Sequence, residues 1–296
     1  MSDPNANPEE RRGASSGDCF PNKVALSQML ERDMAIGLRD RVRGVLVGLA
    51  AGDRIGGPLC MALCLAESLA EGREFSRKDI LNRYLVWWRE GGFDTGFVSG
   101  RVFDLITSGV IDREVVARTH AESGGRTAGC NPAHRSPPLA MAAFLADDRL
   151  PDLARQEAAL THGDPLAGDA AAAVVALCRS LIKGADWPAA LAQAAIDREE
   201  RIRDALLGGS NAPLHDGGFA PEVLRAAVFF LSAHTGFAAA LEASVAFAGP
   251  SNYCPVLVGA IAGARWGAGA VPSELLMHCE ILDRVQTTAS ALAGSW

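Results

Sequence analysis

The sequence predicts an all-α protein, and three observations support this fold class. Apolar residues recur at i, i+3 and i+4 spacing from about Leu38 onward. Runs of β-branched residues with period 2, which indicate strands, are nearly absent. Alanine is abundant, and small residues at this density let helices approach closely. We therefore expect one compact multi-helix domain without an internal repeat.

The expected helices follow from this periodicity and from their stop signals. The first runs from Leu38 and ends at Gly56-Gly57-Pro58. The second covers residues 59–72, and the third covers 76–92, with Ser76 as its expected N-cap and a double glycine at its end. The remaining helical patterns cover residues 113–125, 138–147, 153–184, 186–209, 220–249 and 273–294, and a small-residue apolar helix pattern follows the polar cluster 251–254 within residues 247–267.

The N-terminal residues differ in composition from the rest of the chain. They are polar, rich in Pro, Gly and Ser, and lack the apolar region of a secretory signal. We expect a disordered or appended tail over residues 1–37 and a single domain over residues 38–296.

Composition and charge exclude several classes of partner. The 296 residues are 49% hydrophobic and 21% charged, as in a globular protein with a sizeable core. The net charge of −7 is opposite in sign to that of a nucleic-acid binder. No basic amphipathic helix appears, and no apolar run approaches the ~20 residues that span a bilayer. We expect neither nucleic acid nor membrane as a partner, and the oligomeric state stays open.

The seven cysteines indicate reduced thiols. Their number is odd, and their spacing fits neither a zinc site nor a disulfide framework. We therefore expect a cytoplasmic protein.

Five loops contain most of the polar, glycine and proline residues that lie between the expected helices. They lie at residues 51–58, 90–100, 124–138, 161–169 and 248–255, each beside an apolar helix. Binding and catalytic residues concentrate on loops that a rigid scaffold holds. We expect these loops to form the rim of one cleft.

The order of motifs along the chain resembles the ADP-ribosylglycohydrolase family, from Arg41 to about Glu280. The segments that carry the resemblance are GLAAGDRIGGP, MALCLAESL, YLVWWREGGFDTG, AGCNPAHRSPPLAM, THGDPLAGD and GAIAGARWGAGAVP. The resemblance implies an orthogonal multi-helix bundle that hydrolyses an N- or O-glycosidic bond at the anomeric carbon of ADP-ribose. The implied partner is a small-molecule or ADP-ribosylated substrate.

The resemblance also implies two divalent cations, commonly Mg²⁺ or Mn²⁺, held between a Thr-Asp-Asp and an Asp-x-Asp-Thr motif. This chain has neither motif. The segment 56–60 (Gly-Gly-Pro-Leu-Cys) takes the first place, and Pro250, Asn252 and Tyr253 take the second. Hard cations need carboxylate and other oxygen ligands, so we predict that the family's metal pair is absent and that the protein has no cofactor.

Two aspartates match family positions. Asp94 matches the aspartate of the Phe-Asp-x-Gly turn beside the scissile bond, where a carboxylate acts as general base or stabilises a ribosyl cation. A helix-capping role for Asp94 is the alternative. Asp53, at a helix end, is a candidate substrate-binding residue that alternatively caps the helix or pairs with Arg54.

The segment GCNPAHR aligns with the family loop that holds phosphate and ribose. Asn131 and Arg135 are candidate substrate-binding residues, and the Arg135 guanidinium either clamps a phosphate or braces the loop. His134 is either an acid–base group or a packed, hydrogen-bonded histidine. His162 matches a family histidine near ADP-ribose, although Thr161 to Asp164 also fits an N-cap box.

The loop at residues 248–255 supplies the last candidates. Asn252 and Tyr253 are expected to bind substrate. Cys254, at a helix start, is a candidate nucleophile with a depressed pKa and His134 as its partner. The alternative is that Cys254 is a small buried group.

These residues leave three hypotheses for function. The first is a divergent, metal-independent hydrolase of an ADP-ribosyl or related nucleotide or ribosyl substrate. The second is a catalytically inactive protein that binds ADP-ribose or a nucleotide as a sensor or partner. The third is a different reaction on a nucleoside or sugar.

Overall fold

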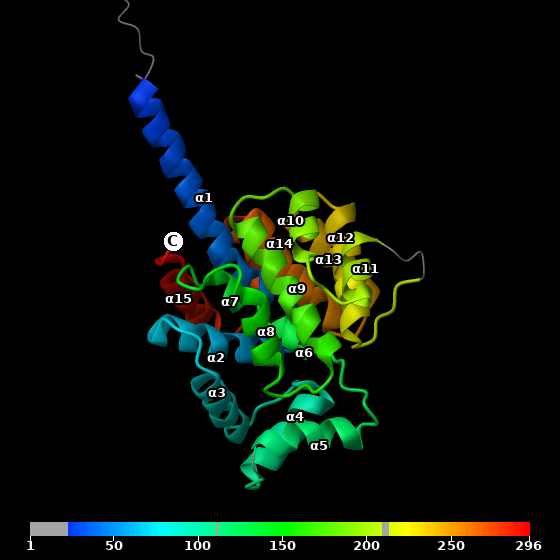
Figure 1. Ribbon diagram of the computed structural model, residues 1–296. Helices are drawn as coiled ribbons and strands as arrows, with labels where there is room; N and C mark the ends of the chain where they lie inside the picture. Colours follow the sequence, from blue (N-terminus) through cyan, green and yellow to red (C-terminus); the bar gives the residue numbers. More distant parts are fainter. Residues whose placement is uncertain (1–22, 111, 209–212) are drawn as a thin grey trace, which may run out of the picture. The chain divides into compact units, whose positions relative to one another are not determined.

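The computed structural model describes residues 23–110, 112–208 and 213–296 and has a helical fold (Figure 1). Within these residues the only β-type pairing is an isolated antiparallel bridge between Gly129 and Phe219. The all-α prediction is therefore confirmed. The helices are α1 (Lys23–Gly52), α2 (Gly57–Gly72), α3 (Arg77–Arg89), α4 (Gly96–Thr107), α5 (Asp112–Glu122), α6 (Asn131–Arg135), α7 (Pro138–Met141), α8 (Leu150–Ala158), α9 (Pro165–Ile182), α10 (Trp187–Ala194), α11 (Glu200–Leu207), α12 (Ala220–Ala233), α13 (Phe237–Ala248), α14 (Tyr253–Trp266) and α15 (Leu282–Ala293), with 3₁₀ turns η1 (Ala268–Ala270) and η2 (Ser273–Leu276).

The contacts divide the chain into two units, Met1–Ala35 and Ile36–Trp296. Helix α1 begins at Lys23, well before the expected start at Leu38, so the predicted tail boundary at residue 37 falls inside a helix. Residues 1–22 of the predicted tail lie outside the described residues. The predicted division into tail and domain stays a prediction.

Helix α9 is the centre of the second unit (Figure 1). It packs against α6, α7, α8, α10, α12 and α14. Among the described helices it alone is long and apolar enough to cross a membrane, but 78% of this stretch is buried inside the protein. Burial among other helices is typical of the core helix of a water-soluble protein. The side chain of Asp164 caps its N-terminus by accepting a hydrogen bond from the Leu166 N–H at 2.9 Å.

Glycines let α1 and α14 cross at very short range. A Cβ atom added at Gly44, Gly48 or Gly52 would overlap the backbone carbonyl of Gly263, Gly259 or Pro255, respectively. The paired positions run in opposite directions along the two helices, so the helices are antiparallel. The end of α1 therefore meets the start of α14, and this places residue 53 beside residue 252.

The described helices differ from the predicted ones in informative places. Ser76 caps α3 as expected, accepting from the Asp79 N–H at 3.3 Å. Helices α4 and α6 lie in segments that the sequence indicated as loops, because Gly and Pro in FDTGFVSG and GCNPAHR hide short helical turns. The long pattern at 153–184 is divided into α8 and α9, since Gly163 and Pro165 interrupt it. The six cysteines in the described part of the chain are free thiols.

The glycine contacts generate the first prediction. Gly48→Ala should destabilise the protein by roughly 3 kcal/mol, because its methyl group overlaps the α14 backbone and forces the helices apart. This corresponds to a fall of roughly 6–12 °C in the thermal unfolding midpoint, measured by calorimetry or circular dichroism.

Gly37→Ala, on the same helix, is the matched control. The nearest atom to a Cβ at Gly37 is Arg41 Nη1 at 3.9 Å, so alanine fits and the midpoint should stay unchanged or rise. Equal effects of the two substitutions would contradict the close crossing.

Candidate functional site

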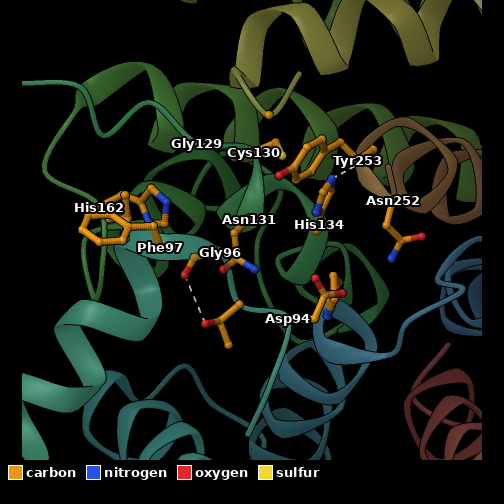
Figure 2. Close-up of a pocket in the computed structure, with 14 residues that line it drawn as sticks. Asp94, Gly96, Phe97, Gly129, Cys130, Asn131, His134, His162, Asn252 and Tyr253 are labelled. Atoms are coloured by element: carbon orange, nitrogen blue, oxygen red, sulfur yellow. Dashed lines mark hydrogen bonds between the residues drawn. The ribbon is translucent and has the colours of Figure 1, made fainter. Parts of the chain in front are cut away.

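All five predicted loops contribute to one pocket of about 170 Å³ (Figure 2). Each loop supplies at least one lining residue: in chain order Pro58, Asp94, Asn131, His162 and Asn252. The expectation of a single cleft is thus confirmed. Asp53, Arg135 and Cys254 do not line this pocket, although the sequence placed them among the candidate site residues.

Asp53 and Asn252 join the end of α1 to the start of α14. The Asn252 side-chain NH₂ donates to Asp53 Oδ1 at 2.5 Å, and Asn252 Oδ1 accepts from the Arg54 N–H at 3.2 Å. Three backbone N–H groups also donate to the Asp53 carboxylate, from Ile55, Gly56 and Leu59 at 3.2, 2.8 and 2.7 Å. Four donors satisfy this buried carboxylate. These contacts favour the structural alternative for Asp53, which shapes the turn into α2, and a substrate-binding role for Asp53 stays a prediction.

Asp94 has the most perturbed carboxyl group of the pocket. Its backbone is left-handed, with φ of 49°, and the nearby Asn252 side chain and Gly57 N–H act to lower the pKa of its carboxyl group. Partial burial of the carboxyl group, followed by the nearby negative charge of Asp53, raises its pKa to about 6. Asp94 does not cap α4, whose N-cap residue is Thr95. Its position and its pKa both fit a proton-transferring group.

Arg135 lies at the centre of a buried hydrogen-bond network. Its side chain is fully buried, and its Nε donates to Glu157 Oε1 at 2.7 Å. Its Nη1 donates to Asn131 Oδ1 at 2.6 Å, and its Nη2 donates to Thr161 Oγ1 at 2.9 Å. The guanidinium also lies over the Tyr84 ring, 5.2 Å from its centroid. Of the two alternatives for Arg135, the structure supports the loop brace and places no phosphate clamp in the pocket.

This network orients two pocket residues. Because arginine only donates, the oxygen of the Asn131 amide faces Arg135, and its NH₂ group is left for the pocket. The Thr161 hydroxyl, which accepts from Arg135, has its proton free for His162 Nδ1 at 2.8 Å. His162 then carries its proton on Nε2. Burial, followed by the charge of Arg135, holds the His162 pKa well below its usual range, so the ring is neutral.

His134 is also a neutral donor. Its Nε2 lies 2.8 Å from the backbone carbonyl oxygen of Tyr253, which only accepts, so Nε2 carries the proton. Burial lowers the His134 pKa to about 4. The ring stacks on Tyr253, with centroids 6.5 Å apart and an interplanar angle of 18°. These contacts favour a packed, hydrogen-bonded histidine over a group that changes protonation near pH 7.

Cys254 lies inside α14. Its residue is 3% exposed, and burial raises the pKa of its thiol to about 12. A thiol with this pKa stays protonated near neutral pH and is a poor nucleophile. The structure therefore favours the small buried group over the nucleophile.

Phe97 and Gly218 line the pocket although the sequence analysis did not single them out. Phe97 follows the Asp94 turn and is 75% exposed. A Cβ atom at Gly218 would lie 3.2 Å from Tyr253 Cζ, so only glycine leaves the Tyr253 ring its present place. An exposed aromatic between glycines was the available signal for Phe97. Gly218 had no local signal, because its partner lies on another element.

The donor set at this junction does not fit a pair of divalent cations. The Asp53 carboxylate already accepts from four donors, and Pro250 offers no side-chain ligand. Among the residues that the structure describes, no group of three or more His, Cys, Asp or Glu side chains is placed to hold a metal ion. The predicted absence of the family's metals stays a prediction.

Comparisons with known proteins agree with the motif order. The family model for ADP-ribosylglycohydrolase matches residues 59–296. The chain belongs to the ADP-ribosylglycohydrolase family. A solved structure of an ADP-ribosylglycohydrolase-related protein complex is similar to it with a TM-score of 0.72 and 28% sequence identity, covering 88% of this chain and 99% of that one. A comparison with curated proteins finds no match.

Membership supports an ADP-ribosylglycohydrolase-like hydrolase and agrees with the helical bundle. The ADP-ribosylglycohydrolase match begins at Leu59, just after the turn that Asp53 stabilises.

The Asp53–Asn252 contact generates the second prediction. Asn252→Asp puts a second carboxyl group against Asp53, and like charges at this distance raise the pKa of one of them above its unfolded value. The variant should lose roughly 1–3 kcal/mol of stability at pH 7. Since a carboxyl with a raised folded-state pKa favours folding only when protonated, part of this loss should be recovered as the pH falls toward 5.

Asn252→Ala is the control, and denaturant unfolding at pH 5 and pH 7 is the measurement. Alanine removes the donor without adding charge, so its stability loss should not shrink at pH 5 in this way. Identical pH profiles for the two variants would argue against the Asp53–Asn252 contact.

Proposed function

We propose that this protein hydrolyses a glycosidic bond at the anomeric carbon of a ribosyl or ADP-ribosyl substrate without the family's metal pair. The observation that carries the proposal is Asp94. It combines a left-handed backbone, a position in the pocket where the five loops meet, and a carboxyl pKa of about 6. Strained backbone and perturbed pKa values concentrate at functional sites.

The chemistry follows from a carboxylate that ionises near pH 6. Ionised Asp94 accepts a proton from a water molecule that attacks the anomeric carbon, while the bond to the leaving group breaks. The same negative charge stabilises the oxocarbenium-like ribosyl cation of the transition state. A general base is most useful when its pKa lies near the working pH, as this one does.

The other lining residues bind and orient the substrate. The NH₂ group of Asn131 and Nε2–H of His162 are fixed donors for the ribose oxygens, held by the Arg135 network. Phe97 and Tyr253 offer exposed ring faces for a base. The pocket volume of about 170 Å³ is below the ~300–1,000 Å³ of sites that enclose a drug-sized ligand, so part of an ADP-ribosyl group would extend into solvent.

We also propose a substrate class and a cellular compartment. The substrate is a small molecule or an ADP-ribosylated group, and the seven scattered cysteines fit a cytoplasmic protein.

A sensor that binds ADP-ribose or a nucleotide without turnover is the second candidate. The saturation of the Asp53 carboxylate by its own neighbours favours it, because a carboxylate in this place no longer offers free oxygens to a metal or substrate. Asp94 distinguishes the two, since a binding protein has no need of a carboxyl group that titrates near pH 6.

The third prediction concerns the pH profile. Because the ionised form of Asp94 is the base, kcat/KM should rise with pH and reach half its plateau near pH 6. Asp94→Asn should lower kcat by roughly 10²–10⁴ and abolish this acid limb. Asparagine tolerates the left-handed backbone, so the fold is kept, as thermal unfolding would verify.

Cys254→Ala is the control for the nucleophile role that the burial of Cys254 disfavours. We expect it to retain the wild-type pH profile. Loss of activity in a folded Cys254→Ala protein, together with an unaffected Asp94→Asn, would transfer the role to the thiol.

The fourth prediction concerns metal. Release of ADP-ribose from ADP-ribosyl-arginine and ADP-ribosyl-serine, followed by chromatography, should be the same in EDTA and in Mg²⁺ or Mn²⁺. Turnover that requires the metal would refute metal independence. Tight ADP-ribose binding by calorimetry without any turnover would establish the sensor instead.

A further inference from the structure

The lining of the pocket has an unusual charge distribution for a site that receives nucleotides. None of the described residues that line it is Lys or Arg. The nearest buried cation, Arg135, has its guanidinium committed to Glu157, Asn131 and Thr161. Both lining histidines are neutral because burial lowers their pKa values. The lining therefore has no full positive charge to offer a phosphate.

The negative charge of the pocket, in contrast, is concentrated at one point. The Asp94 carboxyl lines the pocket, and the Asp53 carboxylate lies close enough to raise its pKa. The first turn of α4 adds backbone N–H groups with about half a positive charge. This is smaller than the full charge of ionised Asp94, which directly precedes that helix. The pocket as a whole attracts cations.

Two exposed aromatic side chains lie at opposite ends of the pocket. In Figure 2, Phe97 lies beside His162, Tyr253 lies beside His134, and Asn131 lies between them. The Phe97 and Tyr253 residues are 75% and 40% exposed, so their rings are available for stacking. Aromatic faces attract cations as well as flat rings.

Asp94 is the one carboxyl group among the described residues that line the pocket. Glycosidases generally use two, one of which protonates the leaving group while the other acts on the opposite face of the sugar. Here Asp53 accepts from four donors, and the two lining histidines are neutral imidazoles, which are much weaker acids than a protonated carboxyl group or an imidazolium. A single carboxyl group suits a substrate whose leaving group departs without being protonated.

We propose that the substrate is a riboside of a cationic aromatic nitrogen heterocycle, bound with its ring against Phe97 or Tyr253, its positive charge near Asp94 and no phosphate inside the pocket. This inference rests on the proposed hydrolase function and specifies its substrate.

The reaction balances without any further reactant. The bond between the anomeric carbon and the positively charged ring nitrogen breaks, and its electron pair stays on the nitrogen, which leaves as a neutral base. A water oxygen forms the new bond to the anomeric carbon, and its proton passes to the Asp94 carboxylate. Asp94 then releases this proton to solvent. No acid is needed for the leaving group, because the departing base gains its electrons from the bond itself.

Four other titratable groups near Asp94 keep one protonation state between pH 5 and pH 7.5. Burial raises the pKa of Cys130 and Tyr253, and it lowers that of His134 to about 4 and that of His162 further. Asp53 and its four donors are unchanged in Asp94→Asn, so the part of the pH dependence that this variant loses reports on Asp94.

Binding of matched ribosides tests the inference. The cationic probe is the β-riboside of 3-carbamoylpyridinium, and the neutral probe of the same shape is the C-riboside of benzamide. By calorimetry at pH 7.5 the cation should bind about tenfold more tightly, equivalent to one unit in the Asp94 pKa. The difference should shrink to about twofold at pH 5, where Asp94 is mostly protonated, and should be absent in Asp94→Asn at either pH.

Two further comparisons probe the ring and the phosphate. Phe97→Leu, which keeps an apolar side chain without a π face, should weaken cation binding about two- to fivefold if Phe97 is the stacking partner. The same substitution in Tyr253, Tyr253→Leu, tests the other ring, and one of the two should show the effect. The 5′-phosphate of the cationic riboside should bind more weakly than the riboside itself.

Three outcomes would overturn the inference: tighter binding of the 5′-phosphate or of ADP-ribose, equal binding of the cationic and neutral ribosides, or a cation preference that survives Asp94→Asn. Turnover distinguishes this failure from that of the proposed function. Release of ADP-ribose from ADP-ribosylated substrates by a protein that ignores the cationic riboside defeats the inference alone. Preferential binding of the cationic riboside without release of its base, with all other substrates inert, supports the inferred ligand class and defeats the hydrolase.

Discussion

The close crossing of α1 and α14 is the constraint on which the site depends. Glycines on both helices remove the side chains that would otherwise separate them, and the backbones come into direct contact. Because the helices are antiparallel, Asp53 at the end of one meets Asn252 at the start of the other. Their hydrogen bond then fixes the turn into α2 and the first turn of α14 together. Pro58, Asn252 and Tyr253 reach the pocket only because this junction is tight.

A second set of long-range contacts fixes another part of the pocket. The bridge between Gly129 and Phe219 ties two loops that are far apart in the sequence, with the Cys130 N–H donating to the Gly218 carbonyl at 3.0 Å. Arg135, buried beneath it, fixes the hydrogen-bonding direction of Asn131. The described lining residues other than Asp94 are uncharged near neutral pH, and Asp94 is the one whose charge changes there. The electrostatic potential in the pocket therefore depends mainly on the protonation state of Asp94 and on the charge of the bound ligand.

Local patterns in the sequence predicted much of the fold and the place of the site. Helical periodicity, the capping residue Ser76 and the Gly- and Pro-rich loops act over a few residues, so they can be recognised without a structure. The roles of Arg135 and Asp53 could not, because their partners are Glu157 and Asn252, far away in the chain. The role of Cys254 could not be predicted either. Its position at a helix start does not tell whether the thiol is exposed to solvent or buried in the core. Helix α4 was missed because its glycine-rich start masks the periodicity that follows.

The Asp53–Asn252 junction has a consequence for how the site comes into being. A junction bridged by a bound ion forms in proportion to the concentration of that ion, and its stability follows mass action. Here both partners are side chains of the same chain, so closing the junction is a unimolecular event whose equilibrium does not depend on the protein concentration. The geometry at the start of α14 is thereby established at the moment of folding, and it is equally present in a dilute and in a concentrated solution.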